Sequence, residues 1–147
     1  MASTYLTSLP KDLMTELIRY GANWPTYIER LPPELREEVE SYYAGITVTL
    51  IGRGRRVEGW GGRGDIVELQ LTTPRGRYLI TTPEGLVHDW TWYRRVLFGA
   101  PYGLTNTGKY GLSLLNDRRE VVEEFTPAQI VSIDRQLSVI RDYLIMY

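Results

Sequence analysis

Residues 65–83 read DIVELQLTTPRGRYLITTP, and this stretch decides the fold class. Its first half alternates in the way a β-strand requires, with Val67, Leu69 and Leu71 on one side and Ile66, Glu68 and Gln70 on the other. The tetrapeptide LTTP at 71–74 returns as ITTP at 80–83, on either side of the turn residues Pro-Arg-Gly at 74–76. We therefore expect a hairpin of strands 66–72 and 77–82 at the centre of an antiparallel sheet.

On the N-terminal side of this hairpin the same alternation continues. Ile46, Val48 and Leu50 alternate with threonines and predict a further strand over 46–51. Residues 52–64, GRGRRVEGWGGRG, then hold six glycines and four arginines and predict a loop.

The Gly/Arg loop is a candidate nucleic-acid surface. Arginine forks bind phosphates, an aromatic ring stacks on a base, and glycine lets the backbone approach closely. The residues concerned are Arg53, Arg55, Arg56, Trp60 and Arg63, with Arg75 and Arg77 expected nearby on the adjoining hairpin. The simpler interpretation is a solvated hairpin loop, which the slightly acidic net charge of −1 favours.

On the C-terminal side the pattern is less regular. Residues 86–98, LVHDWTWYRRVLF, combine alternating tryptophans with a helical spacing, and we expect a strand early and a helix or turn late. Residues 99–110 are rich in Gly, Pro, Asn and Thr and predict a loop. A second hairpin is expected from 112–115 and 120–125, joined by the turn Asn-Asp-Arg-Arg at 116–119.

The last 20 or so residues predict a long amphipathic helix. Thr126, Pro127 and Gln129 form a capping box, with the helix running from about Pro127 to Met146. Its apolar positions Ile130, Ile133, Leu137, Ile140, Leu144 and Tyr147 repeat at spacings of 3 and 4, a heptad seam. The seam predicts packing onto the chain's own sheet, or alternatively an oligomer interface through Ile133, Leu137, Ile140 and Leu144.

A repeated phrase fills the N-terminal third. Residues 4–20, TYLTSLPKDLMTELIRY, and residues 26–42, TYIERLPPELREEVESY, share the pattern T-Y-[LI]-x-x-L-P-x-[DE]-L-x-x-E-[LV]-x-x-Y. Proline at the first helical position and an acid in the first turn are helix-start signals. Two copies predict two short amphipathic helices, the first more buried than the second, with Gly21 and Gly45 as C-terminal caps.

The repeated L-P-x-[DE]-L resembles the opening of the F-box, above all the F-box-like segments at the N-termini of large DNA virus proteins. The F-box is a helical module that docks a Skp1-type adaptor and so presents a target to a ubiquitin ligase. The resemblance implies docking through Leu9, Pro10, Leu13, Leu17 and Ile18, and at the second copy through Leu31, Pro32 and Leu35. The alternative is that both helices simply pack on the chain's own sheet.

The composition argues against an enzyme. The chain has no cysteine and one histidine, His88, which removes thiol nucleophiles and most transition-metal sites. No phosphate-binding loop, calcium loop or zinc-protease pattern is present in the sequence. We therefore expect no catalytic residue, no metal and no cofactor.

These observations together predict an α+β protein of 147 residues. A helical pair at 1–44 is followed by a β-rich region at 45–147 that is closed by the C-terminal helix. The expected function is a non-enzymatic protein–protein interaction or adaptor protein, viral in character; the alternatives are a nucleic-acid-associated protein and a structural or virion assembly component. Without an apolar run of about 20 residues or a signal-like N-terminus, we expect an intracellular protein of the cytoplasm or virion and no membrane partner.

Overall fold

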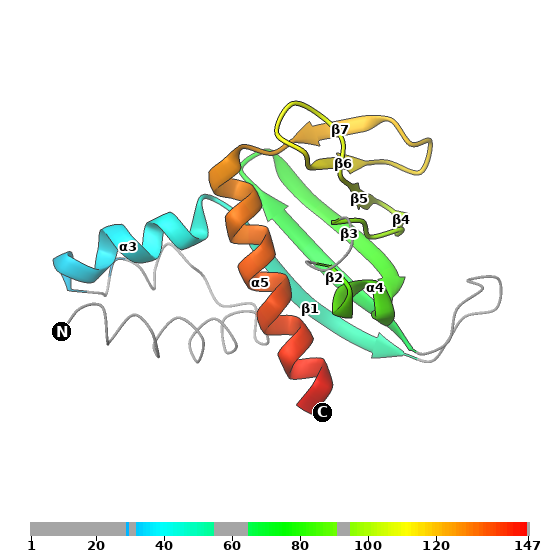
Figure 1. Ribbon diagram of the computed structural model, residues 1–147, viewed down its shortest axis with the longest axis horizontal. Helices are drawn as coiled ribbons and strands as arrows, with labels where there is room; N and C mark the ends of the chain where they lie inside the picture. The colour runs from blue at the N-terminus through cyan, green and yellow to red at the C-terminus, as the bar shows by residue number, and fades with distance from the viewer. Residues whose placement is uncertain (1–28, 30–31, 55–64, 91–94, 147) are drawn as a thin grey trace.

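The computed structural model describes residue 29 and residues 32–54, 65–90 and 95–146. In chain order its elements are α3 (Pro33–Tyr43), β1 (Thr47–Gly54), β2 (Ile66–Thr73), β3 (Gly76–Pro83), α4 (Glu84–His88), β4 (Ala100–Pro101), β5 (Gly103–Thr105), β6 (Ser113–Leu115), β7 (Val121–Glu124) and α5 (Pro127–Met146). Two antiparallel sheets have the strand orders β1-β2-β3-β4 and β5-β6-β7 (Figure 1). The mixed α+β class is confirmed; the first predicted helix lies outside the described residues.

The central hairpin forms as the sequence predicts. Strands β2 and β3 pair from Ile66 opposite Pro83 to Thr73 opposite Gly76, which leaves Pro74 and Arg75 as the turn. The Thr73 hydroxyl accepts the Arg75 N–H at 3.0 Å and so closes the turn from the side chain. Each strand is slightly longer than predicted, β2 by Thr73 and β3 by Gly76 and Pro83.

Strand β1 adds to the outer edge of this hairpin and confirms the strand predicted at 46–51. Val48 pairs with Leu71 and Leu50 with Leu69, so the apolar residues of both strands share one face. The register then shifts between Leu50 and Gly52, which marks a β-bulge at Ile51. Beyond the bulge the strand continues to Gly54.

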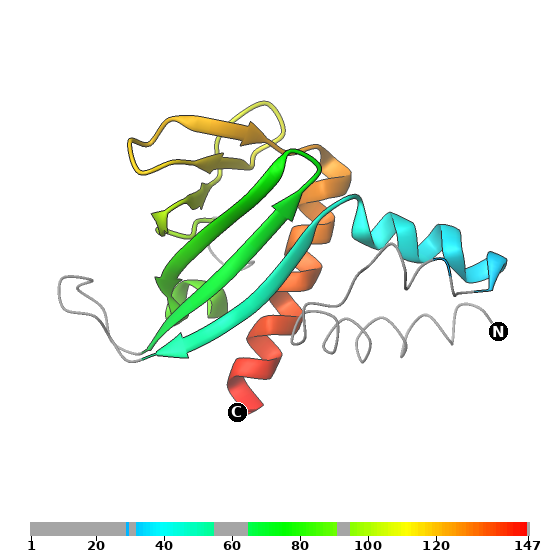
Figure 2. The same cartoon turned by 180° about the vertical axis from the view of Figure 1, so that it is seen from behind.

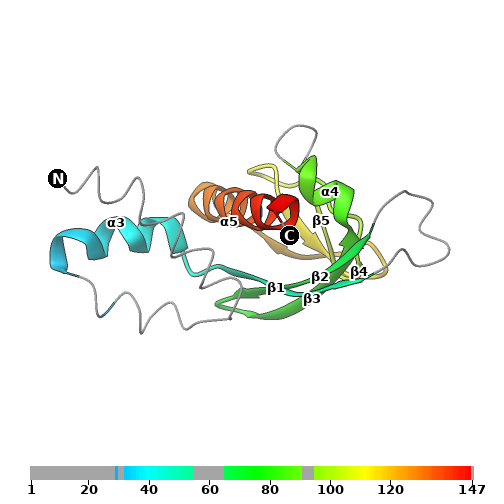
Figure 3. The ribbon, with the colours of Figure 1, turned by 90° about the horizontal axis from the view of Figure 1, so that it is seen from below.

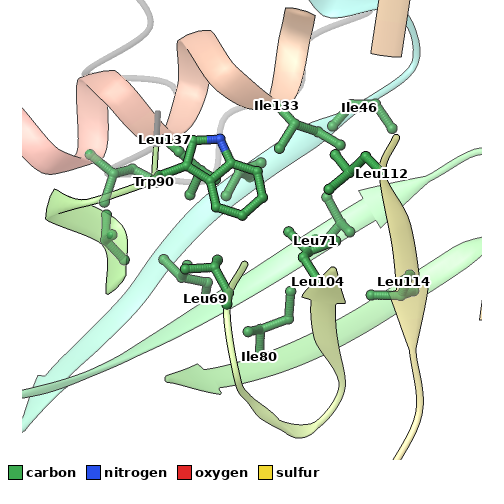
Figure 4. Close-up of a cluster of buried hydrophobic side chains, with 14 of the residues drawn as sticks. Ile46, Leu69, Leu71, Ile80, Trp90, Leu104, Leu112, Leu114, Ile133 and Leu137 are labelled. Carbon is green, nitrogen blue, oxygen red and sulfur yellow. The ribbon is translucent and has the colours of Figure 1, made fainter. Parts of the chain in front are cut away.

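Helix α5 crosses one face of the four-stranded sheet, and α4 lies on the same side (Figure 3). In the opposite view no helix of the described chain covers the other face (Figure 2). The described heptad positions of α5 are buried in the core. Figure 4 shows Leu137 close to Trp90, and Ile133 close to Ile46 and Leu112. This is the packing of a one-stripe helix on a sheet.

The described core is drawn entirely from residues 46–144. Its members are Ile46, Val48, Val67, Leu69, Leu71, Ile80, Val87, Trp90, Leu97, Leu104, Leu112, Leu114, Phe125, Ile130, Ile133, Leu137, Val139, Ile140 and Leu144. Among the α3 side chains that the structure describes, Tyr43 is partly buried against it. The described core is therefore supplied by the β-rich region together with α4 and α5.

The predicted capping box is confirmed at the start of α5. The Thr126 hydroxyl accepts the Gln129 N–H at 3.3 Å, and the Gln129 side-chain oxygen accepts the Thr126 N–H at 3.1 Å. The second predicted hairpin is confirmed as β6 and β7, whose turn is tied by the Asn116 side-chain oxygen accepting the Arg118 and Glu120 N–H groups. Both features are local in sequence.

Two expectations on the C-terminal side of β3 were wrong. Residues 86–88 do not begin a strand; they belong to α4, which starts at Glu84 directly after Pro83. Residues 99–110 are not wholly loop, since they contain β4 and β5. Close backbone approach explains the second error: a Cβ on Gly99 would lie 2.5 Å from the Tyr102 carbonyl oxygen, and one on Gly103 would lie 2.7 Å from that of Leu97.

Candidate interaction surfaces

Most of the predicted adaptor-docking residues lie outside the described residues: Leu9, Pro10, Leu13, Leu17, Ile18 and Leu31. At the second copy of the motif, Pro32 is the N-cap of α3, Pro33 is its first residue and Glu34 stands in its first turn. Leu35 is in the same turn. The helix ends at Tyr43, and its C-cap is Ala44 rather than the predicted Gly45; both residues have positive φ.

Helix α3 is attached to the β-rich region through its C-terminal end. The Tyr43 carbonyl oxygen accepts a hydrogen bond from the Ser132 hydroxyl of α5 at 2.8 Å. From there α3 extends away from the sheets (Figure 1), and Pro32, Pro33 and Glu34 at its start are exposed. The arrangement presents the opening of the second motif on the protein surface.

Arg75 and Arg77 do not lie near Arg53 at the start of the Gly/Arg loop, contrary to the expectation from the sequence. Arg55, Arg56, Trp60 and Arg63 lie outside the described residues. Arg53 pairs with Val67 across the sheet, whereas Arg77 pairs with Thr72, five residues further along β2, a separation of about 17 Å. Arg75 lies in the turn beyond Arg77, so both residues are at the opposite end of the sheet from the Gly/Arg loop.

Arg53 is also engaged within the chain. Its guanidinium binds the Glu84 carboxylate through two hydrogen bonds of 2.5 and 2.9 Å, and Asp65 lies 3.7 Å away. His88, one turn along α4, contacts the same carboxylate at 3.0 Å. Burial raises the pKa of the Glu84 carboxyl, but the hydrogen bonds from His88 and Arg53 outweigh it and hold that pKa below its ordinary value. This cluster joins β1 to α4.

The heptad seam of α5 is turned inward. Ile133, Leu137, Ile140 and Leu144 are at most 2% exposed and belong to the chain's own core. The predicted oligomer interface through these four residues is therefore wrong: the sheet occupies the surface that a second helix would need.

Two polar clusters, the first partly exposed and the second buried, were not predicted. In the first, the Trp90 indole N–H donates to Asp134 on α5 at 2.8 Å, and Arg95 forms an ion pair with the same carboxylate at 3.0 Å. In the second, Glu123 of β7 is 5% exposed and accepts a hydrogen bond from the Thr73 hydroxyl at 2.7 Å. Each cluster joins elements that are far apart in sequence.

Tyr78 completes the second cluster. Burial, together with a hydrogen bond to Glu123, raises the pKa of the Tyr78 hydroxyl. Its ring packs edge-to-face on Tyr102, with the centroids 5.0 Å apart. Because Thr73 and Tyr78 belong to the large sheet and Glu123 to the small one, the cluster ties the two sheets together.

An open groove of about 350 Å³ lies between residues 97–100, strand β5 and the β6–β7 turn. Leu97, Leu104 and Leu115 supply apolar lining, and Asp117 and Arg119 supply charge. Phe98 lines the groove and is nevertheless 64% exposed. Nothing in the local sequence signals this groove, because it forms between segments that the fold brings together.

Within the described residues no group of three or more His, Asp or Glu side chains could hold a metal ion. Of the helices in that part of the chain, none is both long and apolar enough to cross a membrane. Comparisons of the chain with protein-family models, with curated proteins and with solved structures each found no match.

Proposed function

We propose that this protein is a non-enzymatic adaptor that binds a Skp1-type partner through its two N-terminal L-P-x-[DE]-L segments. The supporting observation is the position of the described core relative to these two segments. The described core is formed by residues 46–144, and the Tyr43 side chain at the end of α3 packs against it. Both L-P-x-[DE]-L segments, at 9–13 and 31–35, precede the residues that form the described core.

The local structure of the second motif also supports the proposal. Pro32 and Pro33 start α3, and Glu34 places negative charge at its positive end. The exposed start of the helix stands away from the sheets, where a partner protein can reach it. Amphipathic helices commonly bind a partner by laying their apolar residues into its groove.

The polar side-chain clusters of the β-rich region support a scaffold role for that region. Glu84, Asp134 and Glu123 each bind side chains from another element, so their contacts join parts of the fold. Arg53, the one described arginine at the Gly/Arg loop, is bound to Glu84, which weakens the case for a phosphate-binding surface there.

The test is binding of the purified full chain to a purified Skp1-type adaptor by biolayer interferometry. Leu13→Asp and Leu35→Asp, one in each motif copy, should each weaken binding, and the double variant should abolish it. Thr15→Asp is the matched control, since position 15 falls outside the apolar stripe of Leu13 and Leu17. Circular dichroism and tryptophan fluorescence report whether each variant folds. Absent binding, or equal binding by the folded double variant, would reject the proposal.

A further inference from the structure

The groove beside β5 lies within a larger apolar surface. Phe98 is 64% exposed, and Val121, which pairs with groove-lining Leu115 across β6 and β7, is 55% exposed. Large apolar side chains that gather on a soluble protein's surface mark an interaction site. We call Phe98, Leu115, Asp117, Arg119 and Val121 the Phe98 patch.

The Phe98 patch is self-complementary: it contains a side chain that fits a groove and the groove itself, and an acid together with a base. It holds a projecting aromatic side chain and an apolar groove beside it. It also holds one exposed acid, Asp117, and one exposed base, Arg119, and neither has an ion-pair partner among the described residues. When two copies are related by a two-fold axis through such a surface, each side chain of one copy meets the complementary side chain of the other, and the same contact forms twice.

We propose that the Phe98 patch is an interface between two copies of this chain. In the dimer, Phe98 of each copy enters the groove of the other, and Asp117 of each copy faces Arg119 of the other. The groove volume of about 350 Å³ is enough for an aromatic ring with its neighbouring atoms. The opposite charges cancel within each patch, so two copies meet without net repulsion.

The patch is small, so the dimer is weak. Stable interfaces bury roughly 800 Å² on each partner, whereas this surface comprises one groove and a few side chains. We expect dissociation in the micromolar range, with a strong dependence on protein concentration. The small sheet lies well away from α3 (Figure 1), so dimerisation leaves the second motif exposed.

The backbone conformation of Arg119 suits a charge-exchange experiment. Arg119 has φ 61°, in the left-handed region that Asp and Asn occupy more readily than most residues. Arg119→Asp therefore changes the charge at no backbone cost. Asp117 is exposed in the same turn, so Asp117→Arg does not alter the core either.

Sedimentation velocity of the full chain, from about 5 to 500 μM, tests the dimer. We expect a monomer–dimer equilibrium whose dissociation constant rises roughly tenfold or more in Phe98→Ser, as for removal of a central interface residue. Leu79→Ser is the matched control: Leu79 is also an exposed apolar residue, 40% exposed, but lies on the four-stranded sheet outside the patch. It should dimerise like the unaltered chain.

Charge exchange tests the geometry. Asp117→Arg and Arg119→Asp should each dimerise less than the unaltered chain, because like charges then face one another. An equimolar mixture of the two should recover association, since each heterodimer restores opposite charges. A monomer at every concentration, a Phe98→Ser chain that dimerises undiminished, or a mixture that does not recover would each overturn the proposal. The chain is measured alone, so the result is independent of adaptor binding.

Discussion

The side-chain amide of Gln136 acts as a strand partner for Val48. Its oxygen accepts the Val48 N–H at 2.7 Å, and its nitrogen donates to the neighbouring Ile46 carbonyl at 2.9 Å. Gln136 lies on α5 and is completely buried. Because β1 is the edge strand of the sheet, the amide satisfies backbone groups that a further strand would otherwise satisfy. One residue therefore fastens α5 to the sheet and closes part of an exposed edge.

Replacing Gln136 with Met keeps the length and removes the hydrogen bonds. We expect the free energy of unfolding to fall by about 2–4 kcal/mol, because the Val48 N–H and the Ile46 carbonyl lose their partner inside the protein. Urea denaturation followed by tryptophan fluorescence measures the loss. Gln70→Met, on a half-buried site of β2, is the control and should change stability little.

Amide hydrogen exchange tests the loss of the Gln136 hydrogen bond at a single residue, Val48. The Val48 amide should exchange much faster in the Gln136→Met variant than in the unaltered chain, beyond the change shared by other β1 amides. Equal acceleration across β1 would mean that the substitution lowered global stability without opening this edge.

Most of the structural features that the sequence predicted correctly depend on residues close together along the chain. The hairpin at 65–83, the turn at 116–119 and the capping box at Thr126 each depend on residues within a few positions of one another. The start of α4 had a local signal as well, Pro83 followed by Glu84, but the alternating tryptophans beyond it favoured a strand. The structure uses Trp90 as a buried anchor for Asp134 instead.

Features formed by distant segments had no sequence signal. Strands β4 and β5 have two and three residues, and they exist because β3, β6 and Leu97 supply partners. Gln136 and Val48 are 88 positions apart, and Thr73 and Glu123 are 50 apart. Proximity along the chain also misled: Arg77 follows the Gly/Arg loop by only one strand, and that strand carries it to the far end of the sheet.

Neutralising Glu84 should weaken the joint between β1 and α4 in a pH-dependent way. We expect Glu84→Gln to lose about 1–2 kcal/mol of stability at pH 7, since charged hydrogen bonds to Arg53 and His88 become neutral. The pKa of Glu84 is lower in the folded chain than in the unfolded chain, so the stabilisation is complete above the unfolded value of about 4.5. It disappears as the pH falls through the folded value.

Urea denaturation of both proteins between pH 7 and pH 3 measures this difference. The difference in free energy of unfolding between the unaltered chain and Glu84→Gln, called the gap below, should close toward pH 3. Glu68→Gln, at an exposed site of β2, is the control and should show no such gap. A gap that stays constant with pH would show that the charge of Glu84 is not what holds α4 in place.

Tyr78 should make the fold sensitive to alkali. Its pKa is raised in the folded chain, so the hydroxyl form is favoured there, and its contribution to stability is fully present below the unfolded pKa of about 10. That contribution is lost as the pH rises through the folded value. Tyr78→Phe, which cannot ionise, should therefore lose less stability than the unaltered chain between pH 9 and pH 12.

A matched control separates the effect of Tyr78 from the loss of a tyrosine in general. Tyr110→Phe removes an exposed tyrosine, and it should leave the alkaline loss of stability unchanged. The absorbance of phenolate near 295 nm follows the titration directly. The signal absent from Tyr78→Phe should titrate above the ordinary tyrosine pKa of about 10; titration at or below that value would contradict the buried bond to Glu123.

The capping box should behave as one unit in a double-mutant cycle. Thr126→Ala removes the acceptor for the Gln129 N–H, and Gln129→Ala removes the acceptor for the Thr126 N–H. Each should lower the free energy of unfolding by about 0.5–1 kcal/mol, while Thr126→Ser keeps the hydroxyl and should lose less. Each side chain holds the other residue's backbone in place, so the double variant should lose less than the sum of the two single losses. Strictly additive losses in thermal or urea unfolding would show that the two bonds form independently.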